Sequence, residues 1–237
     1  MQMTDTNVYR IPLHFRLSRP LLKTVFRGIF HGLARVKIIG KENIPYGKPY
    51  VAAMNHVSIF DPPFIGSFWP EQLEIIGAAD VFEKPGQGQL LKAYGVIPVH
   101  RGDYDRSLLT KIISILKSGR PLLIAPEGER SHVTAMQRAK PGVAYIIEQT
   151  GAPVLPVALI GTTEDFWQRA RRGEKPPLEM RIGKPITLPE IKARGAERHA
   201  MRQNNADLVM SYLAGLLPEE YRGVYVESAI PPIQASH

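Results

Sequence analysis

The sequence predicts an α/β fold, in which a single-domain sheet carries helices on both faces and follows an amphipathic N-terminal helical arm. Three observations lead to this prediction. Short runs of β-branched and aliphatic residues alternate with longer stretches of helical periodicity over most of the chain. Several runs, such as Val154–Ile160, are almost continuously apolar, which is typical of strands buried on both faces. The length of 237 residues and the hydrophobic content of 44% suit one large domain.

The predicted elements alternate along the chain. Each strand is a short apolar run, and each helix is a longer segment in which apolar residues recur every three to four positions. We expect an arm over 1–35, a folded domain over 36–217, and a loosely ordered, proline-containing tail over 218–237. The predicted strands are Val36–Ile39, Tyr50–Asn55, Leu73–Ala78, Val96–Val99, Leu122–Ala125, Val154–Ile160 and Glu179–Ile182. The predicted helices of the domain are Phe64–Trp69, Gln87–Tyr94, Tyr104–Lys117, Val143–Gln149 and Glu197–Leu216.

The arm is predicted to contain an amphipathic helix that begins near Pro20, with Ser18 as its cap. At about 100° per residue, its apolar residues cover roughly half of the circumference and basic residues form a row opposite them. Residues 8–41 carry eight Lys and Arg and no acidic residue, whereas 42–237 carry 22 basic and 21 acidic residues. The apolar face consists of Leu21, Leu22, Val25, Phe26, Ile29, Phe30 and Leu33, and the basic row of Lys23, Arg27, His31 and Arg35.

This pattern favours a membrane surface with anionic lipids as the partner of the arm. A helix that docks on the core is the alternative, and an organellar transit peptide is a third interpretation that fits less well, because no linker follows the pattern. A nucleic-acid binder could also place its basic residues in such an arm, but the pattern of the arm favours a different polyanion, so nucleic acid is not an expected partner. No run of 18 apolar residues and no signal-peptide core occurs, so we expect a peripheral or monotopic protein at the cytoplasmic face of a membrane.

The chain contains no cysteine. Disulfides, cysteine-ligated metals and thiol catalysis are therefore excluded. Histidine, aspartate and glutamate do not cluster at the spacing of metal ligands, so no metal site is expected.

A histidine and a carboxylate follow the predicted strand Tyr50–Asn55, at the edge of the sheet where α/β proteins bind ligands. His56 and Asp61 are five residues apart, and in an unbroken helix their side chains would diverge by about 140°. Pro62 favours a helix that begins there with Asp61 as its cap, so that 56–60 forms a turn that returns His56 to Asp61. Such a pair holds an imidazole in one tautomer, as a general base requires. From these residues alone, a simple helix cap beside a buried histidine is an equal alternative.

Three further blocks follow in order along the chain. Gly95–Arg101 ends a predicted strand with a cation, Pro126–Ser131 follows a second strand, and Val154–Gly161 is a third strand that contains a proline. Together with the segment from His56 to Asp61, these blocks resemble the glycerolipid acyltransferase family, of the 1-acylglycerol-3-phosphate (lysophosphatidic acid) acyltransferase type, over roughly residues 36–162. The matching residues are Asn55, His56, Ser58 and Asp61; Gly95 and Arg101; Pro126, Glu127, Gly128, Arg130 and Ser131; and Pro156.

The resemblance implies an O-acyltransferase of phospholipid biosynthesis. It would move a fatty acyl group from an acyl thioester donor to the free hydroxyl of 1-acylglycerol 3-phosphate, a lysophospholipid acceptor, and so produce phosphatidic acid. The implied general base is His56, oriented by Asp61. No cofactor is implied, since acyl-CoA or acyl-carrier protein acts as a co-substrate; acyl-carrier protein would then be a partner.

The resemblance also implies roles for the other matching residues. Substrate-binding residues would be Arg101, Glu127, Gly128 and Arg130. Arg101 and Arg130, expected at neighbouring strand ends, would hold a phosphate, and Glu127 would hold Arg130 or a glycerol hydroxyl. The supporting residues would be Asn55, Ser58 and Pro156. The chain departs from the family pattern at Ala125, where Phe is usual, and at Glu129, where Thr is usual.

Several alternatives stay open at this stage. The acceptor could be another lyso-lipid or lipid-linked polar molecule, and Glu129 leaves its identity more open because it adds an anion beside the phosphate site. Ser58 is an alternative nucleophile, and Lys140 is a further phosphate ligand or a solvated lysine. Outside this class, a membrane lipid-binding module would not need His56 and Asp61 together, and a metal-dependent hydrolase would need more ligands than the sequence offers.

Overall fold

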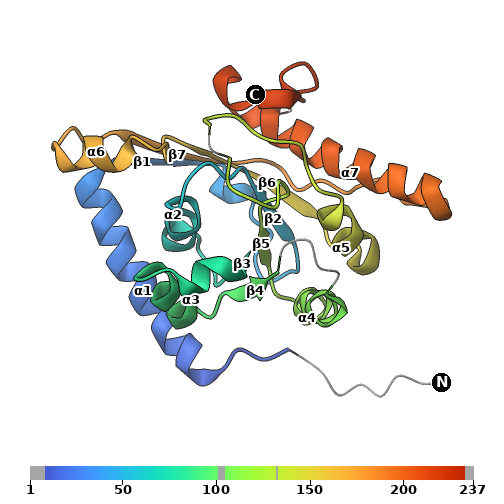
Figure 1. Ribbon diagram of the computed structural model, residues 1–237, viewed down its shortest axis with the longest axis horizontal. Helices are drawn as coiled ribbons and strands as arrows, with labels where there is room; N and C mark the ends of the chain where they lie inside the picture. Colours follow the sequence, from blue (N-terminus) through green and yellow to red (C-terminus); the bar gives the residue numbers. More distant parts are fainter. Residues whose placement is uncertain (1–8, 101–104, 132, 233–237) are drawn as a thin grey trace.

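The computed structural model describes residues 9–100, 105–131 and 133–232. Within these residues, seven strands form one sheet in the order β1-β7-β6-β2-β5-β3-β4 (Figure 1). Strand β2 lies at the centre, and β1 and β4 lie at the two edges. The strands are β1 (Arg35–Ile39), β2 (Val51–Met54), β3 (Glu74–Ala78), β4 (Ile97–Val99), β5 (Leu122–Ile124), β6 (Val154–Ile160) and β7 (Pro177–Ile182).

Strands β2 to β6 all run in one direction. Each neighbouring pair among them is parallel, and Val51 of β2 lies opposite Leu122 of β5 and Val154 of β6. Strand β7 pairs antiparallel with β6 and parallel with β1, so these last two strands run the opposite way. Because parallel strands end at the same edge of a sheet, the loops that follow β2, β5 and β6 emerge side by side.

The α-helices of the described residues come from segments between the strands and from both ends of the fold. They are α1 (Leu13–Leu33), α2 (Asp61–Phe68), α3 (Gln87–Tyr94), α4 (Arg106–Lys117), α5 (Gly142–Thr150), α6 (Phe166–Arg171) and α7 (Gly195–Leu216). Short 3-10 helices cover Lys41–Asn43, Ala79–Glu83, Glu219–Tyr221 and Gly223–Tyr225. The predicted strands and domain helices are all present, with ends that differ by at most three residues, and only α6 was not predicted.

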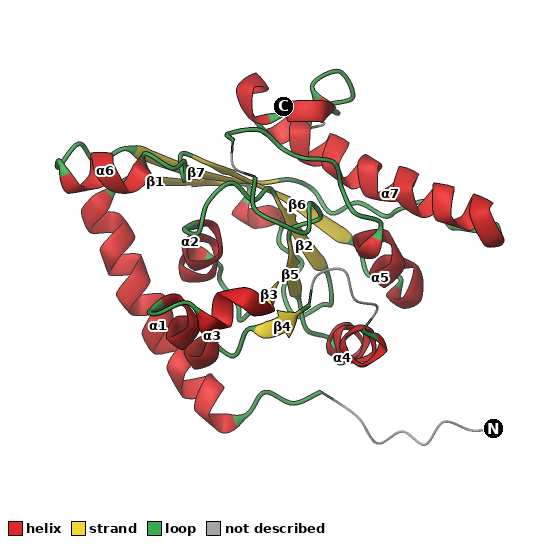
Figure 2. Ribbon diagram, viewed as in Figure 1, coloured by secondary structure: helices red, strands yellow, loops and turns green. Residues whose placement is uncertain are grey.

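Helices cover both faces of the sheet, as the sequence predicts (Figure 2). Successive side chains of a strand point to opposite faces, and β2 shows the division. Val51 and Ala53 belong to the core that the sheet shares with α4, α5 and α7, whereas Ala52 and Met54 belong to the core shared with α1, α2 and α6. The continuous apolar runs in the sequence therefore reflect burial on two sides.

Helix α1 is longer than the sequence predicts, and one side of it packs on the body. It begins at Leu13, so Pro20 lies inside the helix rather than at its start. Tertiary packing overrides the local preference of proline here, because the buried side of α1 is held against α2 and α3. Phe30 is buried, and Leu22 and Phe26 line a cavity between α1, α2 and α3. The prediction that Phe30 faces a membrane is therefore wrong, and Phe26 also packs against the core.

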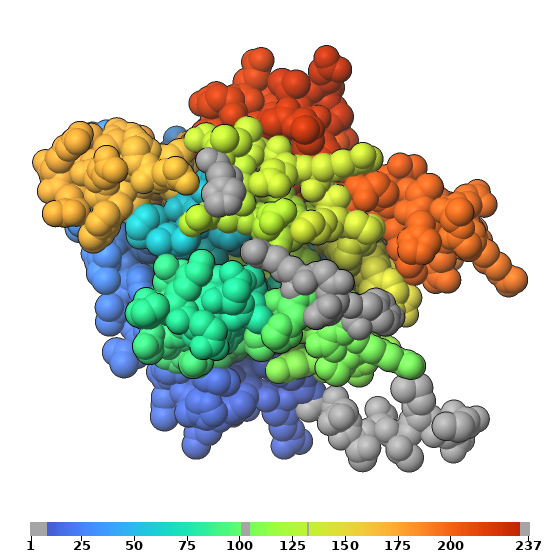
Figure 3. Space-filling view, in the orientation of Figure 1, coloured from blue at the N-terminus to red at the C-terminus, as the bar shows by residue number. Residues whose placement is uncertain are grey.

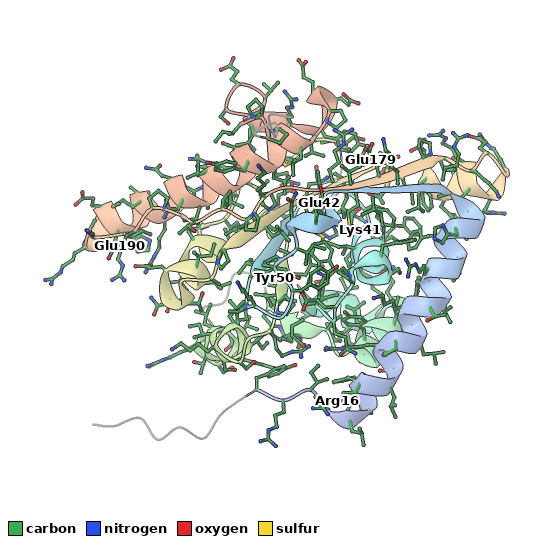
Figure 4. All side chains as sticks on the ribbon, turned by 180° about the vertical axis from the view of Figure 1, so that it is seen from behind. Arg16, Lys41, Glu42, Tyr50, Glu179 and Glu190 are labelled. Carbon is green, nitrogen blue, oxygen red and sulfur yellow. The ribbon has the colours of Figure 1, made fainter. Side chains whose placement is uncertain are left out.

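A different set of apolar side chains is exposed on α1. They recur every four residues, and so form a row that winds slowly around the helix. The row consists of Leu13, Leu17, Leu21, Val25 and Ile29, which are between 44% and 71% exposed. Figure 4 shows the basic residue Arg16 near the N-terminal end of the same helix. None of the helices in the described residues has the length and apolar character that a bilayer crossing requires.

A buried ion pair fastens α1 to the sheet. The two terminal nitrogens of Arg19 donate to the two carboxylate oxygens of Glu74, at 2.8 Å each, and both side chains are almost fully buried. Arg120 and the Tyr9 hydroxyl also donate to this carboxylate, each at 2.9 Å. Burial opposes the ionisation of Glu74, but these hydrogen bonds and charges outweigh it and hold the pKa of Glu74 below its usual value. Helix α1 is thus a built-in part of the domain.

The residues after α7 fold back onto the body, so the prediction of a loosely ordered tail is wrong for 218–232 (Figure 1). Tyr221 and Tyr225 are buried, although Pro-rich composition suggested a loose segment. The carbonyl of Tyr221 accepts from Met136 N at 2.9 Å, and the Tyr225 hydroxyl accepts from Ala139 N at 2.8 Å. Aromatic burial therefore binds this segment to the loop between β5 and α5.

Candidate active site

The candidate site lies at the carboxyl ends of three adjacent strands. His56 follows β2, Glu127 follows β5 and Thr162 follows β6, and β2 lies between the other two in the sheet. In the space-filling view, the cyan residues of the β2 loop and α2 lie against the yellow-green residues of the segment after β5 (Figure 3). This is the edge at which α/β folds place ligands.

His56 and Asp61 are in direct contact, as the sequence predicts. His56 Nδ1 lies 2.8 Å from Asp61 Oδ2, and the residues between them form the expected turn. Asp61 is fully buried, whereas 19% of the His56 side chain is exposed. When Nδ1 donates its proton to Asp61, the lone pair of the imidazole is on Nε2, where a substrate hydroxyl can be deprotonated.

The carboxylate of Asp61 points back into the turn rather than along α2. Its Oδ2 accepts hydrogen bonds from Val57 N at 2.8 Å and from Ser58 N at 2.7 Å. Asp61 is the first residue of α2, and no side chain caps this helix. The predicted role of Asp61 as a helix cap is therefore wrong. Since the carboxylate binds the preceding turn, it shapes the loop that carries His56.

Asn55 extends the pairing of β2 with β6 beyond the end of the strand. Its side-chain nitrogen donates to Leu159 O at 2.9 Å, and its side-chain oxygen accepts from Leu159 N at 2.8 Å. Asn55 is fully buried. These two hydrogen bonds to the backbone of β6 fix the residue that immediately precedes His56.

In the described residues, Glu127 contacts two backbone amides and not Arg130, whereas the expected contact with a glycerol hydroxyl stays a prediction. One carboxylate oxygen accepts from His56 N at 2.9 Å and the other from Gln137 N at 2.8 Å. Burial raises the pKa of Glu127 to about 7, although these two hydrogen bonds act in the opposite direction. Within the described residues, the side chain of Arg130 is not a partner of Glu127. Glu127 thus joins the loop after β2 to the loop after β5.

Of the two predicted phosphate ligands, Arg130 lies among the described residues. Arg130 is half-buried, and in the described part of the chain it forms no ion pair. Arg101 lies outside the described residues. The two strands that precede these arginines, β5 and β4, are separated by β3, so the expectation of neighbouring strand ends is wrong. Chain order does not reveal that β3 is inserted between them.

The turn after β5 contains Gly128 with a φ of 76°, a left-handed conformation that favours glycine. Its amide donates to Ala125 O at 3.0 Å and closes the turn. A side chain at this position would meet Lys140, whose Nζ lies 3.7 Å from Glu129 Oε1. Lys140 thus forms an ion pair with Glu129, the residue that departs from the family pattern.

Ser58 and Pro156 make hydrogen bonds within the turn and the sheet. The Ser58 hydroxyl accepts from Phe60 N at 3.2 Å and stabilises the turn. Pro156 is buried within β6, where its carbonyl accepts from Gly183 N at 2.9 Å. On the β7 side of β6, Pro156 lies between the residues that pair with β7 and Val154, which pairs with Ile186. The backbone nitrogen of proline has no hydrogen to donate, and this position requires none. Pro156 is therefore a residue of strand β6, as predicted, and its supporting role at the site stays a prediction.

Thr162 is a site residue that the sequence analysis missed. It is fully buried, and its hydroxyl donates to Asp61 Oδ1. The sequence did contain a signal for Thr162, because this polar residue closely follows the buried strand β6, whose carboxyl end lies at the same edge of the sheet as those of β2 and β5.

Two cavities lie near these residues. A polar cavity of about 230 Å³ is bounded by Val57, Val133, Thr134, Thr163, Glu164 and Asp165. An apolar cavity of about 60 Å³ lies between α1, α2 and α3, with walls that include Leu22, Phe26, Pro63, Gly66, Leu91 and Val96. Among the described residues, no group of His, Asp and Glu is arranged to hold a metal ion.

Curated relatives resemble this chain over parts of its length. It is 30% identical over 131 residues to the chloroplastic 1-acyl-sn-glycerol-3-phosphate acyltransferase BAT2 of Brassica napus, a match covering 54% of this chain and 38% of that protein. The chain thus spans less than two fifths of that relative. It is 26% identical over 180 residues to the 1-acyl-sn-glycerol-3-phosphate acyltransferase of Bacillus subtilis, covering 73% and 87%. A match of 30% over 113 residues, covering 47% and 43%, links it to the lyso-ornithine lipid O-acyltransferase of Pseudomonas aeruginosa.

The fold also has a counterpart among solved structures. The 1-acyl-sn-glycerophosphate acyltransferase PlsC from Thermotoga maritima superposes with a TM-score of 0.59 at 23% identity, covering 82% of this chain and 79% of that one. This likeness confirms the predicted fold class. The Acyltransferase family model matches residues 35–160, which include β2, β5, β6 and the His56–Asp61 pair. The resemblance read from the motifs is confirmed, and the chain belongs to the Acyltransferase family.

Proposed function

We propose that the protein is an O-acyltransferase that moves a fatty acyl group from an acyl thioester to the free hydroxyl of 1-acylglycerol 3-phosphate and so forms phosphatidic acid. The observation that carries this proposal is the contact of 2.8 Å between His56 Nδ1 and the buried Asp61. Relatives named 1-acyl-sn-glycerol-3-phosphate acyltransferases support the choice of acceptor.

In the proposed reaction, Nε2 of His56 takes the proton of the acceptor hydroxyl as its oxygen attacks the thioester carbonyl. Asp61 keeps the imidazole in the required tautomer and stabilises the positive charge that develops on it. The tetrahedral intermediate then collapses with cleavage of the carbon–sulfur bond. The proton held by His56 passes to the departing thiolate, so the histidine returns to its neutral form. No acyl-enzyme intermediate is required, which agrees with the Ser58 hydroxyl being held in a turn.

The proposed donor is the thioester of CoA or of acyl-carrier protein. The proposed entry point of the acyl chain is the apolar cavity between α1, α2 and α3, whose walls are almost entirely aliphatic and aromatic. At about 60 Å³ this cavity holds only a small part of such a chain, so the rest would lie along the surface or require the helices to move apart. The cavity reaches Pro62 and Pro63, directly after Asp61. The proposed phosphate ligands of the acceptor are Arg101 and Arg130, through forked hydrogen bonds.

A second acceptor class has a specific observation in its favour. The polar cavity beside Val57 is bounded by the carboxylates of Glu164 and Asp165, and Glu129 adds a third acid in the loop after β5. A lyso-lipid whose headgroup carries an amine would suit this side of the site, and one relative is named for a lyso-ornithine lipid. Under this alternative, the chemistry at His56 is unchanged.

The proposed place of action is the cytoplasmic face of a membrane, through α1. The exposed row from Leu13 to Ile29 supports this placement, because its apolar side chains would enter the interface while nearby basic residues meet anionic lipids. The acceptor and the product are lipids, so the placement also brings the enzyme to its substrate.

The test is an assay of the purified protein with labelled acyl-CoA against a panel of lyso-lipids, with and without phosphate and with and without an amine. His56→Ala should lower the rate by about 10²- to 10⁴-fold, the usual contribution of a general base, and Asp61→Asn should remove most of the rate. His199→Ala, an exposed residue of α7, is the matched control. Activity of His56→Ala within about tenfold of wild type would refute the mechanism, and equal use of acceptors with and without phosphate would favour the second acceptor class.

A further inference from the structure

We infer that Thr162 is a positioning residue, which sets the orientation of the Asp61 carboxylate toward His56. The inference rests on the proposed function, because it gives Thr162 a role in the same reaction. The hydroxyl of Thr162 donates to Asp61, so its influence on the reaction passes through that carboxylate.

The two oxygens of Asp61 have very different surroundings. Oδ2 is held by three donors, which are His56 Nδ1, Val57 N and Ser58 N. Within the described residues, the hydroxyl of Thr162 is the donor to Oδ1. Both Asp61 and Thr162 are fully buried, so water does not readily replace this hydroxyl.

The hydroxyl has a geometric task because the terminal torsion of an aspartate is broad and does not hold the carboxylate plane by itself. A carboxylate bound only through Oδ2 could tilt about that oxygen while it keeps its contacts with the turn. The bond from Thr162 to the second oxygen defines the plane, and with it the direction in which Oδ2 faces the imidazole. The tautomer of the His56 imidazole and the direction in which its Nε2 lone pair points depend on that orientation.

Thr162 is itself held from several sides. The amide of Gly161 donates to the Tyr221 hydroxyl at 3.0 Å, so the C-terminal segment fixes the residue before it. Gly161 has a φ of 90°, and a side chain there would overlap Pro177 O. Two residues earlier, Leu159 is joined to Asn55 by two hydrogen bonds. The hydroxyl of a β-branched residue with a restricted χ1 is therefore placed by a rigid backbone.

Two variants separate this positioning role from a packing role. Thr162→Val keeps the shape and removes the hydroxyl, whereas Thr162→Ser keeps the hydroxyl and removes the methyl group. The positioning role predicts that Thr162→Val loses about 10- to 100-fold in kcat with the KM of both substrates within about threefold, and that Thr162→Ser stays within about threefold of wild type. If Thr162 only fills space, the order is reversed, and Thr162→Val should keep a higher kcat than Thr162→Ser.

A double-variant cycle tests whether the effect passes through Asp61. In the Asp61→Asn background, Thr162→Val should cause almost no further loss, because the group that it positions is already disabled. If the valine variant does not fold, Thr162→Ser and Thr162→Ala are compared instead, and serine should again be the more active. Activity of Thr162→Val within about threefold of wild type, or equal activity of the serine and alanine variants, would overturn the inference.

The same assay distinguishes a failure of this inference from a failure of the proposed function. Retained activity in His56→Ala would overturn the proposed reaction, whatever Thr162 does. An inactive His56→Ala together with a fully active Thr162→Val would leave the reaction in place and refute the role of Thr162 alone.

Discussion

The buried pair between Arg19 and Glu74 leads to the sharpest prediction of stability. Replacement of Arg19 by Met keeps most of the side-chain volume and removes two hydrogen bonds of 2.8 Å from the Glu74 carboxylate. A third bond, from Arg19 Nε to Tyr94 O at 2.8 Å, is lost with them. Since Glu74 is fully buried, its charge would be left, within the described residues, with Arg120 and Tyr9 as donors.

Breaking a buried ion pair from one side typically destabilises a protein by about 3–5 kcal/mol. Two lost bonds to a charged group, at about 1.5–3 kcal/mol each, give a similar value. We therefore expect Arg19→Met to lower the free energy of unfolding by about 4 kcal/mol, which corresponds to a fall in Tm of about 8–16 °C for a chain of this size. The destabilisation by Arg19→Met should be smaller in acid. Because the pKa of Glu74 is lowered in the folded state, the stabilisation that it provides is lost as the pH falls below the usual pKa of a glutamate.

The assay is urea unfolding followed by circular dichroism and tryptophan fluorescence, with Arg16→Met as the matched control. Arg16 lies on the same helix and is exposed, so its replacement should change stability by less than about 0.5 kcal/mol. Adding Glu74→Gln to Arg19→Met should recover part of the loss, because no unpaired charge then remains. A change of less than about 1 kcal/mol in Arg19→Met would refute the view that this pair fastens α1 to the body.

Three further predictions concern the membrane, the acyl chain and pH. Leu17→Asp should weaken the binding of the protein to anionic vesicles about tenfold or more, as measured by sedimentation. Val224→Asp, which replaces an equally exposed residue on the C-terminal segment, should leave the binding unchanged. Equal effects of the two variants would contradict the role of α1. Gly66 lines the apolar cavity, and a Cβ added there would meet no atom within 4 Å. Gly66→Leu should therefore shift the preference toward shorter acyl donors, while Gly142→Leu on α5 should not. An unchanged preference would place the acyl chain elsewhere. Burial raises the pKa of Glu127 from 4.5 to about 7, so between these two pH values the folded state retains a proton that the unfolded chain releases. Glu127 therefore lowers the free energy of unfolding as the pH rises through this window, by about 3 kcal/mol in total. Glu127→Gln should therefore gain stability relative to wild type between about pH 5 and about pH 8 in denaturation experiments, and a constant difference would contradict the raised pKa.

The elements and the His56–Asp61 contact were predictable because their signals are local. A strand that is buried on two faces appears as an apolar run, and such runs marked β2, β5 and β6. The strands β1 and β7 contain charged residues and alternate in burial, and they were marked by short β-branched or aliphatic segments instead. The return of His56 to Asp61 needs only a short turn before Pro62, so five residues of sequence contain the information. The carboxylate direction was predicted incorrectly, since capping and turn contacts use the same residue type at the same position.

The contacts between distant segments were not predictable in the same way. The helical periodicity of α1 indicated a broad apolar surface, but it could not tell which half would meet the body, and Phe30 proved to be buried while Leu21 is exposed. The order of strands in the sheet is also not written in the chain order. For this reason the link from Thr162 to Asp61 was missed, and β4 and β5 were wrongly expected to be neighbours.

The separation along the chain of the groups around Asp61 has a consequence for folding kinetics. His56 and Asp61 are five residues apart, but Glu127 reaches the His56 amide across 71 residues, and Thr162 reaches Asp61 across 101. Contacts of such long sequence separation form slowly, because the entropy of closing the intervening loops opposes them until the strands between have paired. The two-residue dyad can therefore approach its geometry early during refolding, while its supports arrive only with the completed parallel sheet. Activity should return with the slowest structural phase, after most of the helical signal has been regained.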